Sequence, residues 1–516
     1  MPAARHRPAP FTRLLLVAGT IAATTATLSS CGGGDAAAGA GASVLGGTSQ
    51  GTATPFIRQV QLSGVRVAEL TSVRYTIAAK TGAASKPVSV SYSIDALRRR
   101  GSVDDSADSL TLSVFGLYAN HANQVAFELT YDDSNVQTMN VEVDTDPYVD
   151  PNGLYDHPTV LQARAPGSAL GFDYLALKNM RGGPIIIDTD GAVRWVAPAV
   201  VTDSTSTAFT DNGFEIGAKD STVMTRVELD GTSAQTTLAV ADATNFHHNI
   251  DHGKTGLLVE LDRTVGGVKN LESTLAEVNP DGSVIREWDL AALIANHMSS
   301  RGDDPSAFVR PGVDWLHNNA SAYDPSDDSI IVSSRENFVV KFDYTTGNII
   351  WILGDPTKYW YTFASLREKA VTLQAGDLYP IGQHAISVTA AGELMLFNNG
   401  LGSLNEPAGA PAGQSRTYSA VSTYSIDPSS LTAHEVARFD HGQTILSDIC
   451  SSAYEAGDRS LLVNYAVADN RTLARVIGLD PSRNVMFDFE YPSPPSQPCS
   501  TSWNAVPVPL DNMTFQ

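Results

Sequence analysis

Three histidine-bearing segments carry the side chains best suited to nucleophilic and acid–base chemistry in this chain. His247 and His248 stand before Asn-Ile-Asp, His317 stands within Asp-Trp-Leu-His-Asn-Asn, and His384 follows Gly-Gln. Near pH 7 a neutral imidazole is a good nucleophile and can also exchange protons. Each segment leads through a turn into a β run, which predicts equivalent places in three repeated sheets, with the histidines facing one centre.

Two polar residues of the second segment bear on this interpretation. Asn319 follows His317 closely, and Arg335 ends the run Ser333-Ser334-Arg335. Taken singly, a histidine at a strand start is more often a hydrogen-bonded structural residue, and such an arginine normally forms a surface ion pair. The repeated layout, together with Asn319 and Arg335 in the same repeat, favours a functional site.

A repeated strand–turn–strand unit supplies the framework that must position these residues. Its turns are led by aspartate or asparagine, and the Asp-Gly and Asp-Pro pairs in them favour tight hairpins. Copies occur at residues 185–191, 227–231, 276–282, 340–347, 424–428 and 477–481. Because one unit cannot bury both of its faces alone, the repeat predicts blades stacked around an axis, as in a β-propeller. A β-sandwich or a linear solenoid is the alternative.

The fold class expected is therefore all-β, a six-bladed β-propeller over residues 151–516 with a small N-terminal β-sandwich domain over residues 55–150. In the smaller domain, apolar and polar residues alternate in runs such as 88–94, 110–114 and 125–131, the period of half-buried strands. Residues 144–155, with two prolines and a glycine, read as a linker. Helical spacing over 289–298 and 364–375 predicts two insertions between blades, the first beginning at a capping Asp289.

The N-terminal residues have the pattern of an export signal. Arginines precede a short apolar run over residues 14–23, and Leu28-Ser29-Ser30-Cys31 resembles a bacterial lipobox. We expect residues 1–30 to be a lipoprotein signal peptide, Cys31 to carry the lipid anchor, and residues 31–54 to form a flexible tether. The protein would then be exported to the periplasm or cell surface and held on a membrane only by that anchor. The alternative is a plain signal peptide with an incidental cysteine.

Net charge limits the classes of binding partner, and the cysteine content bears on disulfide formation. The 516-residue chain has a net charge of −22 and only 17% charged residues. A strongly acidic body repels nucleic acid and anionic lipid, so neither is an expected partner. Once Cys31 is set aside as the lipid anchor, two cysteines are left, Cys450 and Cys499. An even number of cysteines in an oxidising compartment predicts that these two form a structural disulfide. The sequence alone does not show that the two lie close together.

The longest motif lies around His317 and resembles the bacterial aryl-sulfate sulfotransferase family. It runs from Asp314 to Asp355 through Tyr-Asp-Pro-Ser-Asp-Asp-Ser-Ile-Ile-Val-Ser-Ser-Arg and Trp-Ile-Leu-Gly. Gln383-His384, leading into Leu396-Phe397-Asn398-Asn399-Gly400, is similar to the same family. The resemblance covers most of the chain after the tether and implies a small β domain ahead of a six-bladed propeller.

Activity and site roles follow from that resemblance. The family moves sulfuryl groups from a phenolic sulfate ester to another phenol without a nucleotide sulfate donor, which implies small aromatic partners and no cofactor. Carried over, His384 is the nucleophile that forms a sulfohistidine in a ping-pong reaction. His317, Asn319 and Arg335 surround the sulfuryl oxygens, because imidazole, amide and guanidinium donors can hold developing charge. A second histidine would exchange protons with the phenols.

Other correspondences are looser. His248, beside Asn-Ile-Asp, is favoured over His247 as the further site histidine, and Thr501 matches a threonine near the family's C-terminus. Four aromatic residues close to the motifs line an aromatic pocket or belong to the blade cores: Phe246, Trp315, Phe397 and Trp503.

Two other functions compete with a sulfotransferase. A metal-dependent hydrolase would use His248, His317 and His384 as ligands of one ion. Against it, Arg335 would repel a cation, and no carboxylate stands at an expected ligand spacing, so no metal site is predicted. The other rival is a non-catalytic propeller that binds ligands at the cell surface, which the fold class permits. The natural donor, the acceptor and the oligomeric state are not indicated by the sequence.

Overall fold

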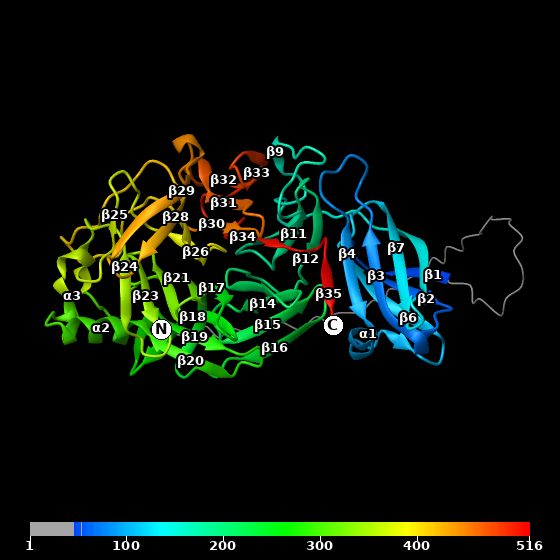
Figure 1. Cartoon of the computed structure of the whole chain (residues 1–516), viewed down its shortest axis with the longest axis horizontal. Coiled ribbons are helices and arrows are strands. Elements are labelled where there is room, and N and C mark those ends of the chain that lie inside the picture. The colour runs from blue at the N-terminus through cyan, green and yellow to red at the C-terminus, as the bar shows by residue number, and fades with distance from the viewer. Residues whose placement is uncertain (1–45, 53) are drawn as a thin grey trace, which may run out of the picture.

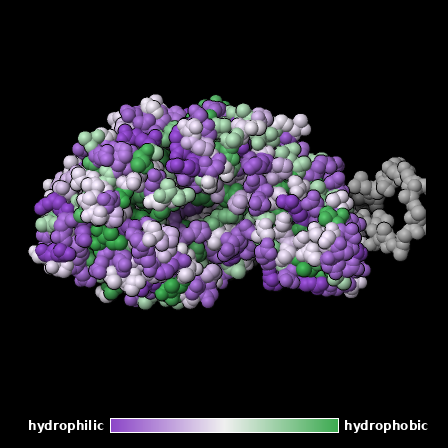
Figure 2. All heavy atoms as spheres, viewed as in Figure 1, coloured by the Kyte–Doolittle hydropathy of each residue, from purple (hydrophilic) through white to green (hydrophobic). Residues whose placement is uncertain are grey.

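The computed structural model describes residues 46–52 and 54–516 (Figure 1). The expected signal peptide and Cys31 lie outside the described residues. Within the described part, no helix combines the length and the apolar character needed to cross a membrane. On the face drawn in Figure 2, hydrophobic residues form small separate groups on a mainly hydrophilic surface.

The N-terminal domain consists of two sheets. The first has the order β1-β2-β6-β5, and the second has the order β35-β4-β3-β7-β8. Alternation builds their shared core, since Val125, Phe127 and Leu129 of β7 are buried between outward-facing neighbours. The strands are β1 (Gly46–Gly51), β2 (Ile57–Ser63), β3 (Leu70–Ile77), β4 (Val88–Ser93), β5 (Val103–Asp104), β6 (Ser109–Phe115), β7 (Ala122–Tyr131), β8 (Val136–Asp144) and β35 (Met513–Phe515).

The end of the expected tether differs from the prediction. Residues 46–51 form β1, which pairs antiparallel with β2. This segment is rich in glycine, serine and threonine and shows no apolar alternation, so only the open edge of β2 reveals it as a strand. The expected tether therefore ends in a strand.

Six further sheets follow between residues 159 and 508 and form the β-propeller (Figure 1). The first three contain β10 (Tyr174–Lys178), β11 (Ile185–Asp188), β12 (Val193–Val196) and β34 (Asn504–Val508); β13 (Thr207–Thr210), β14 (Gly213–Gly217), β15 (Val223–Glu228) and β16 (Ser233–Thr237); and β17 (Ala243–His252), β18 (Leu257–Val265), β19 (Val268–Val278) and β20 (Val284–Asp289).

The last three sheets complete the propeller. They contain β21 (Asn318–Asp324), β22 (Ser329–Ser334), β23 (Val339–Asp343) and β24 (Ile349–Leu353); β25 (Thr372–Leu373), β26 (His384–Val388), β27 (Leu394–Asn398), β28 (Ala420–Asp427) and β29 (Thr432–Phe439); and β9 (Thr159–Gln162), β30 (Ser452–Glu455), β31 (Leu461–Val467), β32 (Leu473–Leu479) and β33 (Val485–Pro492).

The six predicted hairpins occupy one place in the repeat. Each joins the third and fourth strands of its sheet, for example β11 to β12 through Asp188 and Gly191 and β15 to β16 through Asp230 and Gly231. The Gly191 amide donates to the Asp188 carbonyl at 3.0 Å, and Gly191 has φ 89°, which glycine adopts without strain. The repeat read from the sequence is thus the outer hairpin of each sheet.

The ends of the chain close the propeller. β34 is the innermost strand of the first sheet beside β10, and β9 is the outermost strand of the last sheet beside β33. The innermost strands β13, β17, β21, β26, β30 and β34 contact one another in succession. Residues near these strands can therefore meet at the centre although the sequence separates them widely.

The C-terminal strand joins the two domains. In Figure 1 β35, drawn in red, lies beside β4 of the N-terminal domain, and the two pair in parallel. Arg194 of β12 is buried at the same boundary, donates to the Gly116 carbonyl at 2.7 Å and lies over the Tyr118 ring. One apolar core continues from the N-terminal domain into the first two propeller sheets.

Helices are short connections. α2 (Leu290–Ser300) forms where predicted, with the Asp289 carboxylate accepting from the Ala292 amide at 2.8 Å. The second predicted helix, 364–375, is wrong beyond its first turn, because α3 ends at Arg367 and residues 372–373 form β25 beside β29. The β-branched Val371 and Thr372 favour that edge strand. The others are α1 (Ile94–Arg99), α3 (Ala364–Arg367), α4 (Ala468–Arg471) and the 3-10 turns η1 (Val67–Glu69), η2 (Pro305–Ala307), η3 (Tyr359–Thr362) and η4 (His441–Gln443).

Candidate active site

The structure brings the histidines of the three segments together at the propeller centre. The rings of His248 and His317 have centroids 4.6 Å apart, and those of His248 and His384 are 6.5 Å apart. His247 and His248 are neighbours at 4.6 Å. The indole of Trp503 stacks on His248 at 5.2 Å and meets His384 edge-on at 6.3 Å. The imidazoles of His247, His248, His317 and His384 and the indole of Trp503 thus gather around one small volume.

Irregular strand pairing places these side chains. In the three sheets that carry the histidines, the register between the first two strands shifts at the histidine segment, at residues 246–250, 318–320 and 384–387. The backbone is in the left-handed region at His248 (φ 49°), His317 (φ 54°) and Ala385 (φ 50°). Such bulges redirect side chains away from the ladder, and strained non-glycine backbone gathers at functional sites.

His384 is held in one tautomer. Its Nδ1 lies 2.8 Å from Asn399 Oδ1 and 3.1 Å from the Gly382 carbonyl. The Asn399 amide is itself oriented, because its Nδ2 donates to the carbonyls of Ser447 at 2.7 Å and Cys450 at 2.9 Å. Both Nδ1 neighbours are acceptors, so the proton sits on Nδ1 and the lone pair is on Nε2.

Burial keeps His384 neutral. Its pKa is well below the usual histidine range because burial disfavours the charged form, and His248 and Arg335 lower that pKa further. A neutral imidazole with a free Nε2 is the nucleophilic form.

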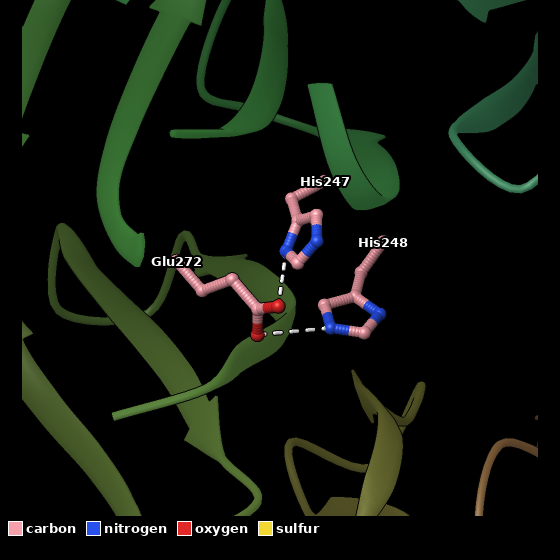
Figure 3. Close-up of side chains that lie close together, drawn as sticks. All are labelled: His247, His248 and Glu272. Carbon is pink, nitrogen blue, oxygen red and sulfur yellow. Dashed lines mark hydrogen bonds and ion pairs between the residues drawn. The ribbon is translucent and has the colours of Figure 1, made fainter. Parts of the chain in front are cut away.

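A carboxylate that the sequence analysis missed links the other histidines. Glu272 of β19 pairs with His247 Nδ1 through one oxygen and with His248 Nε2, at 3.1 Å, through the other (Figure 3). Its Oε2 also lies 2.9 Å from His317 Nδ1. No spacing in the sequence could show this, because pairing between β17, β18 and β19 brings Glu272 to the histidines.

Glu272 corrects one argument made against a metal ion. The sequence showed no carboxylate at a ligand spacing, yet Glu272 lies among the histidines, and Asp314 Oδ2 is 2.6 Å from His317 Nδ1. Two groups, His247 with His248 and Glu272, and His317 with Glu272 and Asp314, have potential ligand atoms within 4.8 Å of one another. In Figure 3, however, each imidazole contacts its own oxygen of Glu272 directly.

Charges differ sharply between neighbouring rings. Burial lowers the pKa of His317, but Glu272 and Asp314 outweigh it and raise that pKa to about 10. Burial lowers the pKa of His248 to about 4 despite the nearby carboxylate. The pKa of Glu272 is well below its usual range, because the three histidines outweigh the effect of burial. Near pH 7 His317 is therefore an imidazolium beside the Glu272 carboxylate, and His248 is neutral.

Arg335 and Asn319 lie in the wall of the site. Arg335 is 2% exposed and paired with Glu336, and its backbone amide donates to the His317 carbonyl at 3.0 Å. Its Nη2 has no hydrogen-bond partner within residues 46–52 and 54–516. Asn319 Nδ2 donates to the Gln383 carbonyl at 2.8 Å, which ties the His317 segment to the residue before His384. Arg335 Nη2 is therefore available to donate to a ligand.

Thr501 is placed differently from the other predicted residues. It is fully buried, its hydroxyl donates to the Pro492 carbonyl at 2.7 Å, and its carbonyl accepts from the Tyr155 hydroxyl at 2.5 Å. Its side chain therefore holds backbone near the site. Two residues on, Trp503 makes the ring contacts with His248 and His384.

The cysteines and aromatic residues have clear places. Cys450 and Cys499 are bonded, which confirms the predicted disulfide. Phe246, Trp315 and Phe397 belong to apolar cores, whereas the partly buried Trp503 packs against the disulfide region and contacts the rings of His248 and His384. The side chains of His247 and His317 are 30% and 19% exposed, so they mark the open side of the site.

Comparison with known proteins gives two matching family models. The model described as Arylsulfotransferase (ASST) matches residues 158–498, and the Arylsulfotransferase Ig-like domain matches residues 60–146. Arylsulfate sulfotransferase AssT of Escherichia coli O6:H1 is 30% identical over 174 residues, covering 30% of this chain and 28% of the relative. Arylsulfate sulfotransferase AssT of Lelliottia amnigena is 27% identical over 248 residues, covering 39% of this chain and 41% of the relative. The chain thus aligns with less than half the length of either relative.

Two solved structures are similar at a low level. The β-propeller domain of Myceliophteria thermophila Cps50 (Swd1) has a TM-score of 0.34 and 10% identity, and covers 66% of this chain and 100% of its own. The gluconolactonase XC5397 of Xanthomonas campestris has a TM-score of 0.32 and 12% identity, and the match covers 65% of this chain and 94% of the gluconolactonase. The propeller arrangement described above rests on the strand pairing of this chain.

Proposed function

Since this chain belongs to the arylsulfotransferase family, we propose that it transfers a sulfuryl group from a phenolic sulfate ester to a phenol acceptor. The observation that carries the proposal is His384, a buried neutral imidazole whose Nδ1 proton is engaged by Asn399 Oδ1 at 2.8 Å. That arrangement leaves Nε2 as a nucleophile beside cationic and amide groups.

The reaction has two displacements. In the first, the His384 Nε2 lone pair forms a bond to sulfur, the bond between sulfur and the phenolic oxygen breaks, and the phenoxide that leaves takes up a proton. In the second, the acceptor phenol loses its proton, its oxygen bonds to sulfur, and the nitrogen–sulfur bond breaks to restore Nε2. The same histidine thus gives and receives the group in a ping-pong cycle through a sulfohistidine.

Charged and polar neighbours would stabilise the transferred group. Its three free oxygens carry negative charge, and Arg335, His317 and Asn319 surround them in this proposal, with Arg335 and Asn319 as hydrogen-bond donors and His317 as a positive charge. Arg335 Nη2 supports this role because it is buried and lacks a hydrogen-bond partner in the described part of the chain. Trp503 offers an aromatic face for the phenol rings beside His248 and His384.

The first test is release of a coloured phenol from an aryl sulfate, with and without a second phenol. The wild-type protein should release it faster when the acceptor is present, and His384→Ala should abolish release while remaining folded by circular dichroism. Release that is equally fast without acceptor would make the enzyme a sulfatase in practice. No release by folded wild-type protein would favour a binding module.

Export and anchoring are part of the proposal. They rest on the pattern of residues 1–30 and on Leu28-Ser29-Ser30-Cys31, which is similar to a lipobox. Radiolabelled palmitate fed to expressing bacteria should label the wild-type protein and leave the Cys31→Ser variant unlabelled. Equal labelling of the two proteins would contradict the proposal that Cys31 carries a lipid anchor.

A further inference from the structure

Glu272 has the geometry of a residue that controls its neighbours. The side chain of Glu272 is 5% exposed, and its backbone lies in the left-handed region with φ 46°. The Glu272 backbone amide donates a hydrogen bond to the Asp262 carboxylate at 2.8 Å. The register of β18 and β19 shifts at this point, in the same sheet that bulges at His248. A strained and hydrogen-bonded backbone thus fixes where the carboxylate points.

The hydrogen-bonding capacity of Glu272 decides where protons lie. An ionised carboxylate only accepts, so His248 Nε2 at 3.1 Å must carry a proton. A neutral His248 then has its lone pair on Nδ1, which is buried without a hydrogen-bond partner in the described residues.

His317 is in a different position. Its Nδ1 faces two carboxylates, Asp314 at 2.6 Å and Glu272 at 2.9 Å, and this pair of negative charges stabilises a positive ring. The opposite nitrogen, Nε2, is the one left to meet a substrate.

We propose that Glu272, together with Asp314, holds His317 as an imidazolium that gives its proton to the departing phenoxide and takes a proton back from the acceptor phenol. Glu272 is then a positioning residue that acts through His317, and His248 stays neutral beside it. This inference rests on the proposed sulfuryl transfer. The protons balance, because His317 becomes neutral in the first displacement and is recharged in the second.

The pKa of His317 supports its role in proton exchange. This pKa is raised to about 10, close to that of an unperturbed phenol such as tyrosine. Proton exchange between groups of matched pKa needs little driving force. His248, with a pKa of about 4, is too weak a base to take a proton from a phenol.

Other ionisable groups act on His317 besides Glu272. They are Asp314 in the same segment, His248 of β17, Glu260 of β18 and His384 of β26. All of these groups remain when Glu272 is replaced, so a comparison between wild type and Glu272→Gln reports on Glu272.

The test measures histidine protonation directly, by nitrogen-15 NMR of the full chain labelled at histidine, without substrate. His317→Gln identifies the His317 signals. In wild type both His317 nitrogens should be protonated at pH 8, and Glu272→Gln should move the titration midpoint down by about 1–3 pH units. The high-pH limb of kcat/KM for an aryl sulfate should move in the same direction, with turnover at pH 8 about 10-fold lower or more.

Glu277→Gln is the matched control. Glu277 lies on the same strand, is fully buried, and accepts from the Tyr344 hydroxyl at 2.6 Å and from the Gly256 amide at 2.8 Å. This variant should leave the His317 midpoint and the pH profile unchanged. Glu272→Asp, which keeps the charge, should restore part of the shift and guards against a folding defect.

Three results would overturn the inference. They are a neutral His317 at pH 8 in wild type, a midpoint unaffected by Glu272→Gln, and stoichiometric divalent metal bound by wild type but lost in Glu272→Gln. The NMR reading is independent of turnover. If no aryl sulfate reacts but the midpoint shifts as expected, the proposed function fails while the control of His317 by Glu272 stands.

Discussion

Proton placement is the residue-scale property on which the candidate site depends. A carboxylate or an oriented amide faces one nitrogen of each central histidine, which determines the chemistry left to the other nitrogen. Asn399 does this for His384 at 2.8 Å, and Glu272 does it for His248 at 3.1 Å. Partners of this kind are needed to keep a catalytic ring in its working tautomer.

Asn399 gives a prediction at this scale. Asn399→Leu keeps the side chain similar in size but removes the acceptor for His384 Nδ1, so the imidazole can place its proton on Nε2 and lose its nucleophile. We expect kcat to fall by about 10- to 100-fold, as for loss of a supporting group. Initial rates of phenol release at saturating aryl sulfate measure it.

Asn399→Asp is the informative comparison. It keeps an oxygen toward Nδ1 but loses the Nδ2 donor to the Ser447 and Cys450 carbonyls. It should retain more kcat than Asn399→Leu if the acceptor matters most. Equal losses in the two variants would show that Asn399 acts only by supporting those carbonyls.

A second prediction concerns the pH dependence of stability. The folded pKa of His317 is raised to about 10 from an ordinary value of 6.5, so between these values the native state binds a proton that the unfolded state has lost. Its contribution is complete below about pH 6.5 and is lost as the pH rises toward 10. The free energy of unfolding of wild type should therefore fall relative to His317→Gln across that window.

Comparison of two urea-denaturation series, at pH 6.5 and pH 9.5, measures this difference. Lys178 and Lys358 act in the opposite sense, since burial lowers the pKa of each to about 8, but they are present in both proteins and cancel. Parallel curves for wild type and His317→Gln would show that His317 is not charged in the folded protein.

At the scale of elements, the sequence predicted the repeat better than the site. Turns led by aspartate or asparagine revealed all six outer hairpins, because a tight turn has a local residue requirement. The bulges at residues 246–250, 318–320 and 384–387 escaped notice, since a bulge depends on how the partner strand is aligned. β1 escaped for a similar reason: its composition is that of a linker, and only the edge of β2 makes it a strand.

The same distinction separates the predicted from the missed site residues. His248, His317, Asn319, Arg335 and His384 stand in recognisable local motifs, so sequence reasoning could select them. Asn399 lay within a quoted motif, but its role depends on a side-chain contact. Glu272 has no local signal, because three strands must pair before it reaches the histidines. Thr501 was selected by position near the C-terminus, and its hydroxyl bonds to backbone.

For the whole molecule, the last residues of the chain connect closure of the propeller to the second domain. Trp503, at the site, directly precedes β34, whose pairing with β10 completes the first sheet. A few residues later β35 leaves the propeller and pairs with β4 of the N-terminal domain. Closure and domain docking therefore use separate strands of one short segment and can be tested separately.

Ending the chain after Asp511 removes β35 and leaves β34 in place. Phe515, which stacks on Tyr92 with centroids 4.7 Å apart, and the buried Met513 are lost, as is the bond from Asn212 to the Thr514 carbonyl. Burial of two such side chains contributes about 3–6 kcal/mol, most of it to the N-terminal domain and its boundary. We expect calorimetry to show a separate, earlier transition for that domain, with kcat unchanged because β34 and Trp503 remain. Phe515→Ala should lower the transition temperature of the N-terminal domain in the same way, but by less. A fall in kcat that follows the lost stability would contradict this separation and would mean that the N-terminal domain supports the site itself.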